Sequence, residues 1–153
     1  MKKIIGISFA CFFLDQLIKY CINEIVSLEK SISIIKNFFE ITYVRNYGAA
    51  FNILDGNRFF LIVIACVTLL LIYYFLKQEP AGNQLEIVGY GLFIGGILGN
   101  LCDRLFRGFV IDYLDFQLFN IHMPIFNFAD ICICFGVFLC VLSLAKGELG
   151  WKK

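Results

Sequence analysis

The hydrophobic positions of the chain fall into four long stretches, each close to the length of a bilayer-spanning helix. Such a helix needs about 20 mostly apolar residues, and the stretches cover residues 4–21, 59–76, 87–106 and 127–145. No linker, repeat or low-complexity tract separates them. The pattern therefore predicts one polytopic membrane domain over residues 1–153, with an all-α core of four transmembrane helices.

Two segments between these stretches have a different pattern, which is typical of β-strands. Residues 39–44 and 109–119 are rich in β-branched and aromatic side chains with partial alternation. Both lie on the side of the membrane opposite the chain ends, so they predict a small sheet at that surface. An extended substrate could add to its edge as a further strand. The alternative is that these aromatics belong to the interfacial belt of a membrane protein.

The composition agrees with a membrane protein and gives no sign of a nucleic-acid, metal or cofactor site. Of the 153 residues, 60% are hydrophobic and 16% are charged. So many hydrophobic residues have more apolar surface than a soluble domain of this size could bury. No basic face or nucleic-acid motif is present. The seven cysteines have no zinc-finger spacing, and His122 is the only histidine. They are best interpreted as small hydrophobic residues, and the sequence indicates no metal and no cofactor.

The orientation of the chain is less clearly indicated. Four spans place both termini on one side of the membrane, but basic residues occur on both sides. Lys2 and Lys3 precede the first span and Glu24 follows it, which favours cytoplasmic termini by the positive-inside rule. The start imitates a signal peptide, yet no small-residue cleavage site follows and Asp15 interrupts the apolar run. We therefore expect a retained first helix.

The most informative polar feature is a repeated Asn-x-x-Asp pattern, Asn100 to Asp103 and Asn127 to Asp130. One lies at the outer end of the third span and the other at the outer start of the fourth, so a helical hairpin places both at one depth. Two adjacent carboxylates there would share a proton, one acting as base on water and the other as acid. The sequence thus predicts Asp103 and Asp130 as a catalytic pair.

Other interpretations of these aspartates remain open. Asn127 and Asp130 could form only a helix cap, but a negative charge at the C-terminal end of a helix, as for Asp103, opposes the macrodipole. A membrane carrier could also use buried carboxylates. Against a carrier, both aspartates are expected near one surface rather than at the bilayer midplane.

Three further patterns accompany the aspartates. Asp15 and Lys19 are four residues apart in the first span, which favours an intrahelical ion pair. The segment from Asn46 to Phe51 contains Gly48 and two alanines, which suit a turn or the close approach of a substrate chain. Small residues at Gly91, Gly95 and Gly99 predict close helix packing that holds the hairpin of the third and fourth spans together.

Taken in order, these motifs resemble the bacterial lipoprotein signal peptidases, also called signal peptidase II, over nearly the whole chain. The five matching motifs are Asp15-x-x-x-Lys19, Asn46-x-Gly-Ala-Ala-Phe51, Gly95-Gly-x-x-Gly-Asn-x-x-Asp-Arg104, Gly108-x-Val110-x-Asp112-Tyr113 and Phe126-Asn127-x-Ala129-Asp130.

The resemblance implies a multi-pass aspartic endopeptidase of the bacterial cytoplasmic membrane, with four helices, an extracytoplasmic β-cradle and an active site near the outer surface. Its substrate would be a diacylglyceryl-modified prolipoprotein, cleaved just before the lipidated cysteine among membrane lipids. It assigns catalysis to Asp103 and Asp130. It implies substrate-binding or dyad-supporting roles for Asn46, Gly48, Asn100, Arg104, Asn127 and Ala129, and positioning roles for Asp15, Lys19 and Asp112. The oligomeric state is not indicated.

Overall fold

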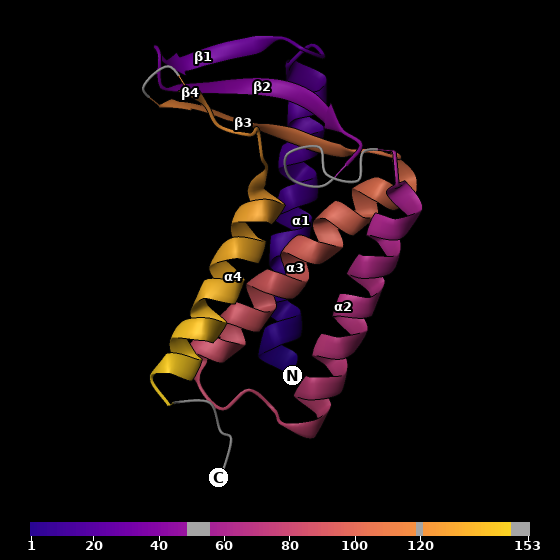
Figure 1. The fold of residues 1–153 in the computed structure, drawn as a ribbon, viewed down its shortest axis with the longest axis vertical. Helices are drawn as coiled ribbons and strands as arrows, with labels where there is room; N and C mark the ends of the chain where they lie inside the picture. The colour runs from indigo at the N-terminus through magenta and orange to yellow at the C-terminus, as the bar shows by residue number, and fades with distance from the viewer. Residues whose placement is uncertain (49–55, 119–120, 148–153) are drawn as a thin grey trace.

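Four long helices form the body of the protein in the computed structural model, which describes residues 1–48, 56–118 and 121–147. They are α1 (Lys2–Ile25), α2 (Arg58–Gln78), α3 (Gln84–Phe106) and α4 (Phe128–Ala145). Each is long and apolar enough to cross a membrane. Figure 1 shows a sheet lying across one end of the bundle, with the start of α1 at the other end.

Helix α3 occupies the centre of the bundle because glycines on two of its faces let neighbouring helices approach. A Cβ added at Gly91 would meet Ile7 at 2.6 Å, and one at Gly95 would meet Cys11 at 2.7 Å. The prediction that the stripe of Gly91, Gly95 and Gly99 holds the α3–α4 hairpin was wrong for Gly91 and Gly95, because the helix turns these two positions toward α1. Gly99 lies close to both α1 and α4.

A second set of glycines makes the α3–α4 contact. A Cβ at Gly89 would meet Cys140 Sγ at 2.7 Å, and one at Gly136 would meet the Phe93 nitrogen at 2.6 Å. A Cβ at Gly96 would clash with the Ala129 carbonyl and approach Ile133 Cγ1 to 2.8 Å. These backbones are in direct contact, which sets the start of α4 close to the outer half of α3.

The Gly96→Ala variant tests this contact. The added methyl group meets helix backbone that cannot move without shifting α4, so we expect destabilisation of about 1–3 kcal/mol, read as a lower unfolding temperature in detergent. Gly6→Ala in α1 is the matched control, because no atom of a neighbouring element lies within 4 Å of a Cβ added there. That change is expected to be neutral or stabilising. Equal unfolding temperatures for the two variants would contradict the packing argument.

Four antiparallel strands form the sheet in the order β1-β2-β3-β4: β1 (Ser31–Ile35), β2 (Phe39–Asn46), β3 (Val110–Leu118) and β4 (Ile121–His122). The predicted strands at 39–44 and 109–119 correspond to β2 and β3, and residue 119 lies outside the described part of the chain. The first strand was missed, although the alternating Ser-Ile-Ser-Ile at its start was a signal for it. Asn46 pairs with Val110 and Val44 with Asp112, which brings two predicted site segments together.

Contacts at both ends of the bundle hold this arrangement. At the sheet end, Val26 packs with Tyr43, Ile111 and Tyr113 in a buried cluster, which seats β2 and β3 on the end of α1. At the opposite end, the buried carboxylate of Glu86 accepts hydrogen bonds from the Gly82 N–H (2.6 Å), the Asn83 side chain (3.0 Å) and the Ser143 hydroxyl (3.1 Å). The bonds tie the start of α3 to the last turn of α4.

Candidate active site

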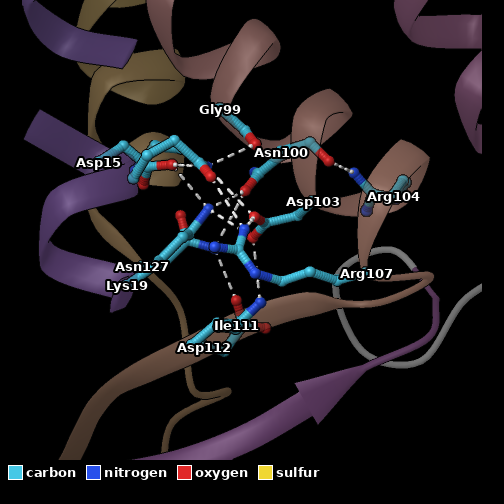
Figure 2. A network of polar contacts seen from close by, with 12 residues as sticks. Asp15, Lys19, Gly99, Asn100, Asp103, Arg104, Arg107, Ile111, Asp112 and Asn127 are labelled. Atoms are coloured by element: carbon cyan, nitrogen blue, oxygen red, sulfur yellow. Dashed lines mark hydrogen bonds and ion pairs between the residues drawn. The ribbon is translucent and has the colours of Figure 1, made fainter. Parts of the chain in front are cut away.

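Asp103 lies at the centre of a buried ionic cluster between α1, α3 and β3. Its side chain has 0% exposure, and its Oδ2 lies 3.0 Å from Lys19 Nζ. Its Oδ1 pairs with the Arg107 guanidinium one turn along α3. The N–H of Ile111 and the side-chain amide of Gln16 each donate to the carboxylate at 3.2 Å. Figure 2 shows Lys19, Arg107 and Ile111 around Asp103.

This surrounding changes the interpretation of Asp103. The sequence argument held that an acid near the C-terminal end of α3 must have a chemical role, since the macrodipole disfavours it. The structure supplies two cations, Lys19 and Arg107, that compensate for the dipole and for burial. Both carboxylate oxygens are occupied by donors from the protein. None of these contacts joins Asp103 to Asp130, and the catalytic role of Asp103 stays a prediction. Arg107 and Gln16 were the partners that sequence reasoning missed.

Asp15 shares this cluster and links it to α4. The predicted ion pair with Lys19 is present, with Asp15 Oδ2 at 2.8 Å from Lys19 Nζ and almost no exposure of either side chain. Asp15 Oδ1 also accepts the N–H of Ala129 at 3.1 Å. Ala129 is fully buried, and its Cβ lies 3.3 Å from a Cβ built on Gly99. A residue larger than alanine would have no room there.

Asp130 begins α4 as part of a capping box. The Asn127 side chain accepts the Asp130 N–H at 3.0 Å, and Asp130 Oδ2 accepts the Asn127 N–H at 3.1 Å. The cap interpretation of the sequence is thus confirmed for this pair. Asp130 also has a contact outside the cap, because its Oδ1 accepts a hydrogen bond from the Asn100 side-chain amide at 2.7 Å. Asp130 is only partly buried, unlike Asp103.

Asp112, on β3, is the buried carboxylate beside Asp130. The side-chain amide of Asn46 donates to its Oδ2 at 2.8 Å, and that of Asn127 donates to its Oδ1 at 2.6 Å. Burial and, after it, the negative charge of Asp130 raise the pKa of Asp112 to about 7, although the two amide donors act in the opposite direction. Near neutral pH, Asp112 therefore holds a proton in a substantial fraction of molecules while it lies in the field of a second carboxylate.

A cavity of about 1120 Å³ opens beside these two aspartates. Its polar end is lined by Arg45, Asn46, Asn100, Arg104, Asp112 and Asp130. Its apolar wall is formed by residues 123–126 and, along α4, by Ile131, Ile133, Cys134, Phe135 and Phe138. Asp103 does not belong to the wall of this cavity. Among the described residues, the carboxylates that reach the cavity are therefore Asp112 and Asp130.

Arg104 links the cavity to the segment after β2. Its guanidinium donates to the Gly48 carbonyl at 3.0 Å and to the Asn100 carbonyl at 3.4 Å. Gly48 is placed by its own N–H, which donates to Asn46 Oδ1 at 2.9 Å. The predicted motif continues through residues 49–51, which lie outside the described residues. Asn46 thus makes the predicted turn and also contacts Asp112.

The described residues contain no group of three or more His, Cys, Asp and Glu side chains arranged to hold a metal ion. All seven cysteines are free thiols.

The sequence matches the family model described as "Signal peptidase (SPase) II" over residues 7–146. The chain belongs to the signal peptidase II family. Two curated lipoprotein signal peptidases illustrate the similarity. The one from Alteromonas mediterranea is 41% identical over 148 residues, covering 94% of this chain and 81% of its own length. The one from Pasteurella multocida is 44% identical over 146 residues, covering 93% of this chain and 88% of its own.

Solved structures agree with the family assignment. A bacterial membrane enzyme solved at 2.3 Å matches this signal peptidase II with a TM-score of 0.88 and 33% identity, over 100% of this chain and 93% of that one. A second, solved at 1.9 Å, matches with a TM-score of 0.84 and 34% identity, over 94% and 93% of the two chains. The protein is a multi-pass membrane peptidase that removes signal peptides from prolipoproteins.

Proposed function

We propose that this signal peptidase II hydrolyses the peptide bond just before a diacylglyceryl-modified cysteine, with Asp112 and Asp130 as its catalytic pair. The observation that carries the pair is the cavity: both carboxylates line it, whereas Asp103 is buried and ion-paired outside its wall. This replaces Asp103, the sequence-based candidate, by Asp112.

The surroundings of the two aspartates favour different protonation states. Asp112 is 3% exposed and has a pKa raised to about 7, so it suits the acid that keeps a proton. Asp130 is more exposed, lies in the first turn of α4, where the helix dipole favours an anion, and accepts two hydrogen bonds. It suits the ionised base. The sequence alone does not assign these two roles, because burial and neighbouring charges come from other elements of the fold.

A balanced reaction follows from these states. Asp130 removes a proton from a water molecule while the water oxygen attacks the carbonyl carbon, and Asp112 donates its proton to the carbonyl oxygen. When the tetrahedral intermediate collapses, that proton returns to Asp112. The proton on Asp130 passes to the leaving nitrogen of the cysteine. The products are a new carboxyl group on the signal peptide and a free amine on the lipidated cysteine.

Three asparagines and an arginine support the pair. Asn100 donates to Asp130, and Asn127 and Asn46 donate to Asp112, so each carboxylate is held in one rotamer. Such pre-organisation is worth orders of magnitude in rate, because a displacement of about 1 Å can cost about 10²-fold. Arg104 adds positive charge at the polar end of the cavity, where it can stabilise the developing oxyanion.

The shape of the cavity supports the lipidated substrate. Its polar end contains the carboxylates near the sheet, and its apolar wall continues down α4 from Ile131 to Phe138. A lipidated cysteine has a polar peptide bond and apolar acyl chains, so its two parts match the polar end and the apolar wall of the cavity. We infer that the sheet lies on the extracytoplasmic side and the termini are cytoplasmic, since Lys2 and Lys3 begin α1 at the opposite end.

Cleavage of a lipidated precursor is the direct test of the proposed function. Purified protein in detergent is expected to cleave a diacylglyceryl-modified prolipoprotein at least about tenfold faster than its unmodified form, because acyl chains add apolar contact with α4. Mass spectrometry of the products gives both the rate and the position of the cut. The control precursor has its lipidated cysteine replaced by serine. Equal rates for the modified and unmodified precursors would contradict the substrate assignment, and cleavage elsewhere would contradict the proposed bond.

The pH dependence tests the protonation states. The pair needs ionised Asp130 and protonated Asp112, so kcat/KM is expected to fall as pH rises through about 7, where free Asp112 loses its proton. Above that point the decline approaches about tenfold per pH unit. The measurement is kcat/KM across the pH range on both sides of that value, with the lipidated precursor as substrate. A rate that stays constant through neutral and alkaline pH would contradict Asp112 as the acid.

A further inference from the structure

Lys19 makes a contact that its role as a counterion does not require. It is fully buried on α1 and contacts two carboxylates, Asp15 and Asp103. With Arg107, which also pairs with Asp103, the cluster holds two positive and two negative charges. Its third contact is with a neutral group, because Lys19 Nζ donates to Asn100 Oδ1 at 2.9 Å.

That contact determines which way the Asn100 amide faces. Asn100 Oδ1 accepts from Lys19 and, at 3.2 Å, from the Asn127 side chain, so its NH₂ group is left to donate to Asp130 Oδ1 at 2.7 Å. In the reversed orientation the NH₂ group would face the ammonium and the oxygen would face the carboxylate. An ammonium has donors and no acceptor, so the reversed amide has no favourable contact on either side.

We propose that Lys19 is a positioning residue for catalysis, which acts through Asn100 to hold the carboxylate of Asp130 in its reactive orientation. This proposal rests on the assignment of Asp130 as the base in the proposed function. Figure 2 shows Lys19 beside Asn100, between α1 and α3. A residue of the first helix thus sets the geometry of a group at the start of the fourth.

Through the same contacts, Lys19 also orients the side-chain amide of Asn127. The Asn127 side-chain NH₂ group donates both to Asn100 Oδ1 and to Asp112 Oδ1. A reversed Asn100 would place its NH₂ group against that of Asn127, which would disturb the donor to Asp112. One ammonium therefore aligns the donors of both cavity carboxylates, although it touches neither.

The test removes the ammonium without leaving a buried unpaired charge. In the double variant Asp15→Asn/Lys19→Met the cluster stays neutral, because Asp103 keeps Arg107, and the amide oxygen introduced at position 15 can still accept the Ala129 N–H. We expect kcat to fall roughly 10- to 100-fold with KM changed less than about threefold, because the cavity wall is intact.

Arg107→Gln is the matched control: it removes a cation from the same cluster but no contact to Asn100, and water can offset the lost charge because the Arg107 side chain is 31% exposed. Its kcat is expected to stay within about twofold of the wild-type value.

A double-mutant cycle with Asn100→Ala separates this role from the others. If Lys19 acts through Asn100, the Asp15→Asn/Lys19→Met change has little further effect on kcat once Asn100 is alanine. A full additional loss in that background would overturn the proposal and indicate a direct effect through Asp103. Normal kcat in the double variant would also overturn it. Neither outcome bears on cleavage by the Asp112–Asp130 pair, which the substitutions of those residues test separately.

Discussion

Replacing Asp112 by asparagine is expected to reduce cleavage of a lipidated prolipoprotein by at least about 10³-fold while the protein stays folded. Asparagine fills the same space on β3, but its amide cannot supply the proton that the carbonyl oxygen takes up. Both Asp112 oxygens accept side-chain amide N–H groups, from Asn46 and Asn127, so the introduced NH₂ group leaves one of these donors without its acceptor, and we expect a loss of stability of about 1–3 kcal/mol. Single-turnover cleavage by purified enzyme measures the chemical step directly.

The neighbouring acid on the same strand is the control for this prediction. Asp115 is also buried on β3 and accepts a hydrogen bond from Thr42 at 3.0 Å, but it does not belong to the cavity wall. Asp115→Asn is expected to keep cleavage within about threefold, while Asp130→Asn is expected to match Asp112→Asn. Wild-type rates for Asp112→Asn would remove Asp112 from the mechanism.

Replacing Asp103 by alanine is expected to destabilise the fold by about 3–5 kcal/mol, because it breaks a fully buried ion pair with Lys19 and removes the ion-pair partner of the more exposed Arg107. Lys19 would retain Asp15 as its counter-charge, whereas Arg107 would lose its ion-pair partner. The N–H of Ile111 would also lose its acceptor. The measurement is the unfolding temperature in detergent together with the amount of protein recovered from membranes.

Asp103→Asn distinguishes a structural role from a catalytic one. The asparagine keeps an acceptor for Ile111 and Lys19, so part of the protein is expected to fold. The folded fraction should cleave within about tenfold of the wild-type rate, because Asp103 lies outside the cavity. A stable Asp103→Asn protein with no activity would restore the sequence-based pair of Asp103 and Asp130.

Much of the fold follows from local patterns in the sequence. Four apolar stretches give four helices, because only a helix satisfies its backbone within lipid. Their observed ends differ from the predicted ones by a few residues; α1, for example, continues to Ile25 rather than residue 21. The two longer strands were predicted from β-branched and aromatic residues, whereas β1, with five exposed residues, has little apolar burial to mark it.

The candidate site shows where local patterns stop being sufficient. Asp130 was found from the Asn-x-x-Asp spacing, since its cap and its role depend on residues three apart on one helix. Asp103 has the same spacing but a different surrounding, because α1 supplies Lys19 from 84 positions earlier in the chain. Asp112 had been assigned only a positioning role. Strand alternation places Asp112 and Asp115 on opposite faces of β3, but it does not say which of the two faces meets the cavity. That depends on how β3 packs against the helices.

By itself the sequence determined that the protein crosses the membrane four times and that it has a sheet at one surface. It also determined which polar residues lie in or beside the apolar stretches, where burying a charge is costly. Those properties depend on hydrophobicity and on spacing along one element. The tertiary structure alone decided which carboxylates share a cavity and which are neutralised by cations. Protonation depends on burial and on charges a few ångströms away, and helices and strands distant in the chain bring those charges together.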